Sequence, residues 1–520
     1  MLFHSYEFIF VFMPIALAIF WLLSRLKQIF LIKFWLILIS LFFYIVWDFR
    51  FLFLLLFSIS VNWLIGEGLA RLRKSLAKND TMTVQIKLLL TLGLVLNLGI
   101  ISYFKYANFF IDTFNLLAFS IDQLDDLVLP LAISFYTFQQ ISYLVEIARG
   151  KGQNFSFLDY LLFVVFFPQL IAGPILNANE LIPQFRASNY RIDSQNIAIG
   201  FTVFAVGLFK KAVIADSIAG YATPIFMVAD QGEAISFILA WQAAIAYTLQ
   251  LYFDFSGYSD MAIGLAKVFN ITLPMNFFSP YKAVSVADFW RRWHLTLGRF
   301  LRNYLYIPLG GSRKGELRRY SNLLITMLLG GLWHGAGWTF VVWGALHGIY
   351  LCISHKWNQF IEKRNFVLDS IYFYCLARLL TLLAIIVSWV VFRANTLGGS
   401  YNIIIGMFGG NGFILPELYI EQLNFLSRLG VQFGTLNNYG GNESVVLLLS
   451  LLGITLFLPN LYQIMSHEVV TLDIYNHLSS QKKAWYRWRP NFIYAGFTAV
   501  LLITALIFRD QPNEFLYFQF

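Results

Sequence analysis

The chain has few charged residues for its length, and this scarcity excludes an ordinary soluble protein. Only 12% of its 520 residues are Asp, Glu, Lys or Arg, whereas 58% are hydrophobic. A soluble protein normally carries about 25% charged residues. The mean hydropathy of +0.66 agrees. Because the apolar runs are also long enough to be membrane helices, the composition predicts an all-α polytopic membrane protein.

Cysteine and the common nucleotide and hydrolase motifs are scarce or missing as well. The two cysteines, Cys352 and Cys375, lie in or beside apolar segments and form no CxxC pair. This argues against disulfide bonds and against a zinc site. The sequence lacks G-x-x-x-x-G-K-[ST], G-x-G-x-x-G, H-E-x-x-H and G-x-S-x-G. ATP-driven, nicotinamide-dependent, zinc-protease and serine-hydrolase functions therefore lose their usual support, and we expect no bound metal.

Long apolar runs are what the chain has instead. Eight early runs are each roughly long enough to cross a bilayer, alone or tilted, and six later runs continue the pattern less cleanly. The early runs lie near 6–24, 33–48, 51–69, 88–108, 129–147, 158–176, 197–214 and 235–254, and the later ones near 256–270, 321–334, 338–354, 372–393, 444–463 and 492–508. No fixed-period repeat or soluble domain interrupts them. We therefore predict one membrane domain over residues 1–520, with 11 to 14 spans.

Charged residues sort the loops into two kinds. Arg71, Arg73 and Lys74 follow the third run, whereas Asp112 and Asp122 follow the fourth. Because basic loops stay in the cytoplasm, this alternation predicts an external N-terminus. The Gly- and Asn-rich stretch at 394–443 carries few charges and suits an external loop. The net charge of +9 is explained by such loops, so nucleic-acid binding is not expected.

The segment 282–319 is the most basic part of the chain. It holds nine basic residues against two acidic ones, so it alone carries +7 of the net charge of +9. The positive-inside rule places it in the cytoplasm. Its basic residues are Lys282, Arg291, Arg292, Arg299, Arg302, Arg313, Lys314, Arg318 and Arg319.

An apolar run directly after this segment ends in His334. A helix over 321–334 rises about 20 Å, which is less than the roughly 30 Å of a bilayer's hydrocarbon core. Gly335, Ala336 and Gly337 permit a tight reversal, and 338–351 is apolar enough to return. His334 is thus predicted near the tip of a hairpin at membrane depth. Ionisable groups there are functional candidates, and the alternative is a neutral histidine hydrogen-bonded within a helix bundle.

A second histidine, His294, lies in the sequence WRRWHLT. Trp290, Trp293, Leu297 and Leu301 can form one face of a helix through it. An amphipathic helix at the membrane interface explains this pattern without catalysis, so function and structure remain open for His294.

Two carboxylates, Asp254 and Asp260, lie at the edge of an apolar run. Paired carboxylates suit a cation or proton site, as in a secondary transporter. Hydrogen bonds from Ser256, Tyr258 and Ser259 at a bend would satisfy them equally well. The residues favour the second interpretation.

Five motifs in order resemble the membrane-bound O-acyltransferase (MBOAT) family, in the bacterial branch that includes alginate and peptidoglycan O-acetyltransferase membrane subunits. The resemblance covers nearly the whole chain, and five ordered motifs make it specific. It implies a helical core of about eleven spans with re-entrant and interfacial helices. The motifs are LPLAISFYTFQQISYLVE, FFPQLIAGPI, LYFDFSGYSDMAIGL, DFWRRWHLTLGRFLRNYLYIPLGG and LLGGLWHGAGWTFVVWGALHG.

The resemblance also assigns residues and partners. The family's near-invariant histidine in LWHG corresponds to His334, and the one in WRRWH corresponds to His294; both are expected to be catalytic. Many relatives have aspartate where this chain has Asn303, so Asn303 is expected at most to donate a hydrogen bond. The resemblance implies acetyl-CoA as cytoplasmic donor, an external partner acetyltransferase and a polysaccharide acceptor at the bacterial inner membrane. The candidate substrate-binding residues are Asn303, Trp333, Trp338, Arg291, Arg313, Lys314, Arg318 and Arg319.

The expected function is transfer of acetyl groups across the membrane to an alginate-like exopolysaccharide. The alternatives are a peptidoglycan O-acetyltransferase subunit, a secondary transporter and a non-catalytic scaffold. Attack of a hydroxyl on a thioester needs a base and an oxyanion donor. His334 is the expected base, and Trp333, Trp338, Asn303 and His294 remain open as the donor.

Overall fold

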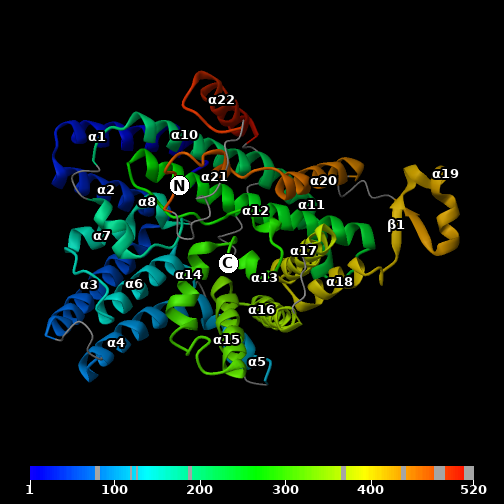
Figure 1. The fold of residues 1–520 in the computed structure, drawn as a ribbon, viewed down its shortest axis with the longest axis horizontal. Helices are drawn as coiled ribbons and strands as arrows, with labels where there is room; N and C mark the ends of the chain where they lie inside the picture. The colour runs from blue at the N-terminus through cyan, green and yellow to red at the C-terminus, as the bar shows by residue number, and fades with distance from the viewer. Residues whose placement is uncertain are drawn as a thin grey trace. The chain divides into compact units, whose positions relative to one another are not determined.

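The structure of the full chain is a computed structural model. The structure describes residues 1–75, 82–117, 120–124, 127–171, 173–185, 190–364, 370–434, 441–472 and 486–508. Helices dominate these ranges, and the only strands within them are the short parallel pair β1 (Phe413–Pro416) and β2 (Val431–Gly434), with Phe413 opposite Val431. Figure 1 shows the helical elements along the chain.

The α-helices run in sequence from α1 to α22. They are α1 Met13–Arg25, α2 Ile29–Ile45, α3 Leu52–Lys74, α4 Val84–Ile101, α5 Ala107–Asn115, α6 Ile133–Ala148, α7 Phe157–Val165, α8 Phe167–Leu170, α9 Ala178–Leu181, α10 Ser194–Phe209, α11 Asp216–Asp230, α12 Phe237–Val268, α13 Val286–Trp290, α14 Leu295–Leu301, α15 Glu316–His334, α16 Trp338–Arg364, α17 Ile371–Arg393, α18 Leu397–Met407, α19 Ile420–Leu423, α20 Gly441–Phe457, α21 Leu461–Ile464 and α22 Phe492–Ile507. Wider, π-helical turns occupy Glu7–Phe12, Ser102–Tyr106, Lys210–Ala215 and Arg302–Tyr306. Turns of 3₁₀-helix occupy Phe49–Phe51, Ile182–Phe185, Pro280–Lys282, Glu417–Tyr419 and Asn424–Leu429.

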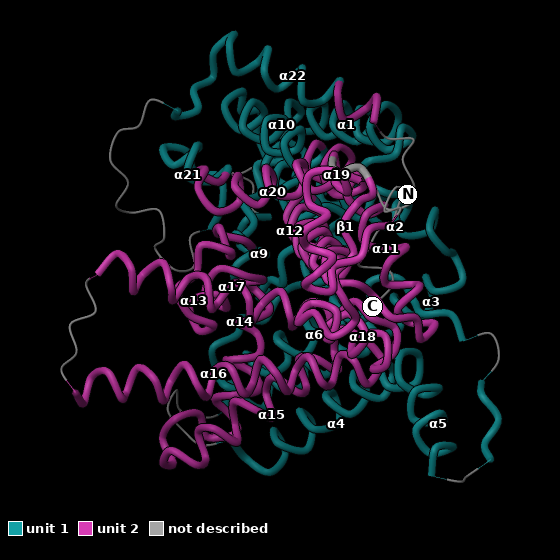
Figure 2. The backbone as a smooth tube through the Cα atoms, turned by 90° about the vertical axis from the view of Figure 1, so that its right-hand side faces the viewer, with its two compact units in different colours: residues 1–208, 258–276, 461–503 teal, residues 209–257, 277–460, 504–520 magenta. Residues whose placement is uncertain are grey.

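The chain folds into two compact units, coloured separately in Figure 2. Unit 1 comprises residues 1–208, 258–276 and 461–503, and unit 2 comprises 209–257, 277–460 and 504–520. Each unit is thus built from three stretches of chain. The single membrane domain predicted from sequence stays a prediction.

Polar side chains join three helices inside unit 1. Gln140 of α6 accepts hydrogen bonds from Ser58 and from Asn62 of α3, both at 2.7 Å. Asn97 of α4 donates to Asn62 at 2.6 Å. All four side chains are buried. In lipid, hydrophobic burial does not drive helices together, so hydrogen bonds between helices contribute to their association.

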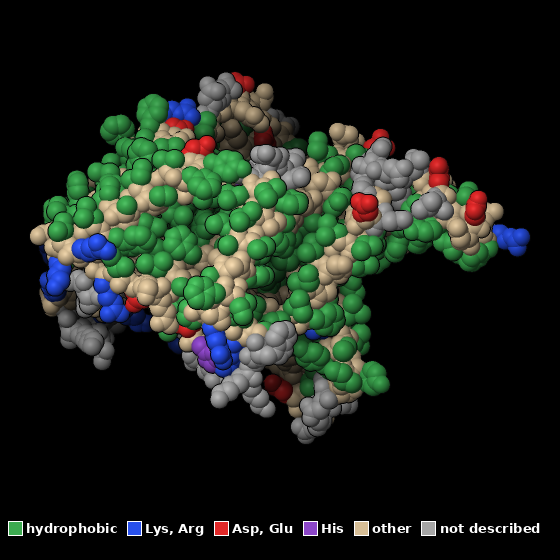
Figure 3. Space-filling model, turned by 90° about the horizontal axis from the view of Figure 1, so that it is seen from above, with side chains coloured by type: hydrophobic (Ala, Val, Ile, Leu, Met, Phe, Trp, Pro, Cys, Tyr) green, Lys and Arg blue, Asp and Glu red, His purple; other side chains and the backbone are tan. Residues whose placement is uncertain are grey.

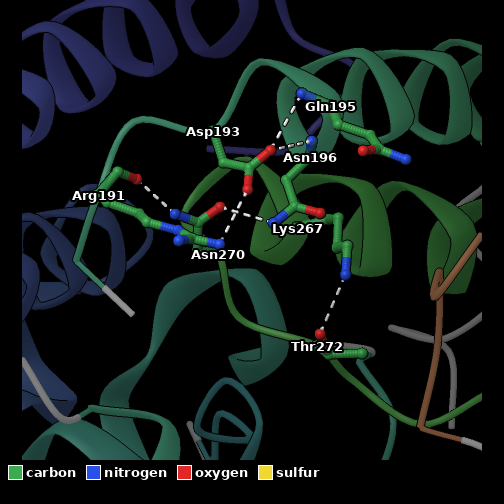
Figure 4. A network of polar contacts seen from close by, with 7 residues as sticks. All are labelled: Arg191, Asp193, Gln195, Asn196, Lys267, Asn270 and Thr272. Carbon is green, nitrogen blue, oxygen red and sulfur yellow. Dashed lines mark hydrogen bonds and ion pairs between the residues drawn. The ribbon is translucent and has the colours of Figure 1, made fainter. Parts of the chain in front are cut away.

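A second polar network in unit 1 joins the start of α10 to the end of α12 (Figure 4). Asp193 accepts from the backbone N–H groups of Gln195 and Asn196, which caps α10. Asn196 donates to Asn270 at 2.9 Å, and Lys267 donates to Thr272 at 3.2 Å. The network thus gives the ends of both helices polar partners.

Unit 2 contains the predicted hairpin, formed by α15 and α16 packed against each other. Three glycines allow the close approach. A Cβ on Gly331 would lie 2.2 Å from the Phe340 carbonyl oxygen, and one on Gly344 would lie 2.4 Å from the Met327 carbonyl oxygen. A Cβ on Gly348 would lie 2.9 Å from Leu324. Small residues at such crossings are typical of membrane helices, and the predicted reversal at 335–337 is confirmed.

The surface agrees with a membrane environment. Five helical segments are long and apolar enough to cross a bilayer: Glu7–Arg25, Phe49–Lys74, Val84–Asn115, Ser194–Asp230 and Ile371–Arg393. Shorter apolar helices occupy Ile29–Ile45, Glu443–Phe457 and Phe492–Ile507. Figure 3 shows hydrophobic side chains spread over much of the visible face. The all-α membrane class is confirmed, whereas the count of about eleven spans stays a prediction.

Three local predictions differ from the structure. The runs 235–254 and 256–270 are one continuous helix, α12, because no Gly or Pro interrupts it strongly enough to break the hydrogen-bond ladder. The run 158–176 is interrupted at Phe166, whose ψ of 106° leaves the helical region; residue 172 lies outside the described part. The loop predicted at 394–443 contains α18 and both strands, while 435–440 lie outside the described part.

Candidate active site

His334 ends α15 and lies among aromatic rings within unit 2. Its ring centroid is 4.9 Å from Trp333, 5.2 Å from Trp343 on α16 and 5.3 Å from Phe392 on α17. Only 8% of His334 is exposed. The helix ends here because Gly335 adopts an extended conformation, with φ −160° and ψ 154°. The hairpin therefore buries an imidazole at its tip, as the sequence predicted.

His294 lies beside His334, and the two ring centroids are 6.4 Å apart. The predicted continuous amphipathic helix through Trp290 and Leu301 is wrong, because α13 stops at Trp290 and α14 begins at Leu295. His294 sits between them in the left-handed conformation, with φ 42° and ψ 54°. Such a conformation costs a non-glycine residue about 1–3 kcal/mol and is found preferentially at functional sites.

The break in the helix turns His294 inward. The side chain is fully buried, with Phe255 at 4.8 Å edge-to-face and Trp333 at 6.2 Å between ring centroids. Burial lowers the pKa of His294 to about 3, because the apolar surroundings penalise the charged ring. His294 is therefore neutral at physiological pH and holds one N–H donor and one acceptor nitrogen.

A hydrogen-bond chain through His347 fixes the wall behind His334. The indole N–H of Trp290 donates to His347 Nδ1 at 3.2 Å, and His347 Nε2 lies 3.0 Å from Ser388 Oγ. Ser388 uses its own proton to donate to the Ile385 carbonyl at 2.8 Å. His347 must therefore be the donor to Ser388, which sets a neutral ring protonated at Nε2.

Trp343 links this chain to His334. Its ring centroid lies 5.2 Å from His334 and 4.7 Å from His347. The sequence analysis did not connect Trp290, Trp343, His347 and Ser388. The four-residue spacing of Trp343 and His347 on one helix was the available signal. The partner Ser388 lies on another helix, so no sequence pattern shows it.

The structure does not bring every predicted substrate-binding residue to His334. Trp333 is buried beside both histidines, whereas Trp338 is 47% exposed. Asn303 lies partly buried in the π-helical turn Arg302–Tyr306. Arg291 is exposed, with its guanidinium 3.9 Å from Asp288.

The predicted donor-binding cations lie at the opposite end of α15 from His334. Arg313, Lys314 and Arg318 are exposed in the loop before α15 and in its first turn. Arg319 differs, because it lies 2.6 Å from His355 Nδ1 and is partly buried. Burial and the nearby arginines lower the pKa of His355, so its Nδ1 accepts from Arg319. Cations at a helix N-terminus oppose the helix dipole, so helix stability does not explain Arg318.

Asp254 and Asp260 do not form a paired site. In unit 2, Asp254 lies 2.8 Å from the ammonium of Lys211, which also contacts Asp216 at 2.5 Å. In unit 1, Asp260 accepts a 2.5 Å hydrogen bond from Tyr462. Six residues along a straight helix rotate by about 600°, which leaves the two side chains about 120° apart. The two aspartates therefore do not form the pair that the cation-site interpretation requires, and the bend interpretation is wrong because α12 runs through both residues.

The sequence missed Lys211 as the partner of Asp254. Lys211 lies in the π-helical turn Lys210–Ala215, which brings residues five apart onto one face and so pairs Lys211 with Asp216. A lysine inside an apolar run was the only available signal. Within the described ranges, no group of three or more His, Cys, Asp or Glu side chains is placed to hold a metal ion.

Comparison with known proteins gives the family. The model of the membrane-bound O-acyltransferase family matches residues 81–394. The chain is 44% identical to the peptidoglycan O-acetyltransferase of Helicobacter pylori, over 82% of this chain and 84% of that protein. It is 39% identical to the probable alginate O-acetylase of Pseudomonas aeruginosa, over 84% of this chain and 79% of that protein.

A more distant relative is the teichoic acid D-alanyltransferase of Streptococcus thermophilus, 26% identical over 44% of this chain and 57% of that protein. These three relatives are named as an O-acetyltransferase, a probable O-acetylase and a D-alanyltransferase, and none of the three is named as a transporter or a scaffold. The match spans more than half of the chain and includes both histidine motifs. The chain therefore belongs to the membrane-bound O-acyltransferase family and is an acyltransferase.

Proposed function

We propose that this acyltransferase takes acetyl groups from acetyl-CoA at the cytoplasmic face and passes them across the membrane to hydroxyl groups of a polysaccharide outside. The observation that carries the proposal is the position of His334 beside His294 in a buried cluster of aromatic rings. This aromatic cluster lies at one end of α15, and exposed cations lie at the other. Sixteen residues separate Arg318 from His334, which corresponds to about 24 Å along the helix.

His334 is the proposed general base. The acceptor hydroxyl loses its proton to His334 while its oxygen bonds to the thioester carbon. The carbonyl oxygen becomes an oxyanion, which needs N–H donors. His294 and Trp333 are the proposed donors, because both rings lie in the aromatic cluster around His334. The carbon–sulfur bond then breaks, and the thiolate receives the proton from His334. The reaction consumes no net proton, so one imidazole suffices to carry it.

The proposed donor site is the start of α15. Its backbone N–H groups point out of the first turn, and helix N-termini attract phosphates. Arg313, Lys314 and Arg318 are exposed around this turn. Coenzyme A carries phosphates that suit such a site, and its pantetheine arm is an extended chain that would reach inward. Arg319 has its own partner in His355 and is proposed to shape the site.

The proposed acceptor is an alginate-like exopolysaccharide in a bacterial cytoplasmic membrane setting, with an external acetyltransferase partner that finishes the transfer. Peptidoglycan is a second candidate, favoured by the 44% identity to a peptidoglycan O-acetyltransferase. Both acceptors require that acetyl groups leave the site at His334 on the external side of the membrane. They differ in which polymer finally receives the acetyl group.

A sealed vesicle of known protein orientation tests the proposal. Labelled acetyl-CoA is placed on the side of the basic segment, and alginate or peptidoglycan fragments with the partner enzyme on the other. Labelled polysaccharide should form in that arrangement, and the preferred acceptor should accumulate more label. If label appears only when donor and acceptor share one side, transfer across the membrane is wrong. If acetyl-CoA is neither consumed nor bound in any arrangement, the donor is wrong.

A further inference from the structure

Unit 1 has an open groove between α10 and α22 that lies outside the candidate active site. Its volume is about 530 Å³, which falls within the usual range for small-molecule sites. Apolar side chains line most of it. From α10 come Ala198, Phe201 and Thr202, and from α22 come Phe492, Ala495, Thr498, Ala499 and Leu502. A hydrogen-bonding contact of 3.4 Å between Thr202 and Thr498 connects the two helices.

One end of the groove is polar and positively charged. Arg489 lines it and is exposed, and within the described part of the chain its guanidinium has no ion-pair partner. Trp488 lines the same end and is only 4% exposed. Its indole N–H has no hydrogen-bond acceptor among the described residues. A buried N–H without an acceptor is costly, so this donor indicates a ligand that supplies an oxygen.

The start of α22 adds to this polar end. Asn491, which also lines the groove, caps the helix by accepting from the Tyr494 backbone N–H at 3.0 Å. The positive end of the helix dipole therefore lies at the same end as Arg489 and Trp488. Three features thus favour an anion there, while the rest of the groove favours a hydrocarbon chain.

We propose that this groove binds one anionic phospholipid of the bilayer. The phosphate accepts from Arg489 and from the Trp488 indole, and an acyl chain lies between α10 and α22. Charge complementarity and the sequence before α22 support this occupant. That stretch carries Lys482, Lys483, Arg487 and Arg489, so the positive-inside rule predicts that the polar end of the groove faces the cytoplasm, where the membrane leaflet is enriched in anionic lipids. Apolar residues of α22 that do not line the groove are exposed, with Ile493 at 79% and Val500 at 60%, as expected beside lipid.

The proposed lipid site is separate from the aromatic cluster around His334, and the proposal does not rest on acetyl transfer. Its test uses the full-length protein, purified in a neutral detergent. Phosphatidylglycerol and phosphatidylcholine of equal chain length are added in turn. Native mass spectrometry counts bound lipids, and thermal unfolding reports stabilisation, because a ligand that binds only the folded state raises the melting temperature. Phosphatidylglycerol should bind one molecule per protein more tightly than phosphatidylcholine and raise the melting temperature more.

Two variants remove the polar end without altering the groove's shape much. Arg489→Gln should weaken phosphatidylglycerol binding about tenfold, the order expected for loss of one charge-assisted hydrogen bond. Trp488→Phe keeps an aromatic ring, although a smaller one, and removes the N–H, so it should weaken binding by a smaller factor. Arg428→Gln, an exposed arginine in unit 2, is the matched control and should change nothing.

A third variant fills the apolar part. Ala499→Trp should block binding of both lipids, whereas Val500→Trp adds the same bulk at a residue that does not line the groove. The proposal is overturned if both lipids bind equally to the wild type. It is also overturned if Arg489→Gln still binds phosphatidylglycerol more tightly than phosphatidylcholine. A third contradicting result is a dimer of the protein that forms through the groove and whose mass does not change when lipid is added. Because every readout is binding or unfolding, loss of acetyl transfer would not mimic these results.

Discussion

The two ends of α15 are opposite in chemistry. At its start, Arg313, Lys314 and Arg318 are exposed. At its end, His334 is buried among Trp333, Trp343 and Phe392. Exposed charges act over about 8–10 Å and weaken with salt, whereas buried groups act through contact and orientation. One helix thus combines a region suited to attract a donor with a region suited to react with it.

The largest expected effect comes from the buried end. His334→Ala should lower acetyl transfer by about 100- to 10,000-fold, because it removes the proposed general base. Purification yield and melting temperature should stay close to wild type. The measurement is turnover of labelled acetyl-CoA by the purified protein with acceptor. Leu329→Ala, at a 45% exposed residue on the same helix, is the control. Activity of His334→Ala within a few-fold of wild type would remove His334 from the mechanism.

The next effect concerns the wall behind His334. Ser388→Ala leaves the His347 N–H without its acceptor, and Trp290→Phe leaves Nδ1 without its donor. Each should reduce kcat about tenfold with little change in KM for acetyl-CoA, because misplacement affects the transition state more than donor binding. Ser354→Ala removes a buried hydroxyl that has no hydrogen-bond partner among the residues that the structure describes, and it serves as the control.

The double variant sharpens this test. If Trp290 and Ser388 act through one His347 ring, their effects should be clearly non-additive. Additive losses would mean that each residue only packs. If KM for acetyl-CoA rises as much as kcat falls, the chain of Trp290, His347 and Ser388 contributes to donor binding instead.

The smallest effect is expected at the exposed end. Reversing Arg313, Lys314 and Arg318 to Glu should raise KM for acetyl-CoA several-fold and leave kcat nearly unchanged, since these charges attract phosphates and do no chemistry. The difference should shrink at about 1 M salt, where screening acts over about 3 Å. Steady-state kinetics at two salt concentrations measure both. Reversal of Arg25, Lys27 and Lys74, exposed cations of unit 1, is the charge-matched control. If KM is unchanged and the membrane orientation is verified, Arg313, Lys314 and Arg318 serve only to set the topology of the chain in the membrane.

Arg319 should behave differently from its exposed neighbours. Its contact with His355 is partly buried, so Arg319→Glu should lower the melting temperature and not only raise KM. Circular dichroism or tryptophan fluorescence during heating measures this. If Arg319→Glu raises KM in a salt-dependent way and leaves the melting temperature unchanged, Arg319 acts like the exposed cations and attracts the donor.

Composition and apolar runs predicted the all-α membrane class, and the LWHG motif predicted His334 at a hairpin tip. These features are local, so sequence periodicity and glycine position suffice. His294 shows the limit. Its helix pattern was amphipathic over many residues, yet the chain breaks there into a left-handed residue that tertiary packing holds in place. Partners such as Lys211 for Asp254 and Ser388 for His347 come from distant segments, which one sequence does not bring together.

The close packing at the glycines between α15 and α16 has a consequence for the length of the acyl donor. Gly331 and Gly344 lock the hairpin in register, so α15 cannot slide or rotate to adjust. Because each residue adds about 1.5 Å and about 100°, inserting one residue between Arg318 and His334 would turn the imidazole away from Trp343 and Phe392. If the donor binds at the start of α15 as proposed, the number of residues in α15 would select donors by the length of the arm that joins their charged head to their thioester.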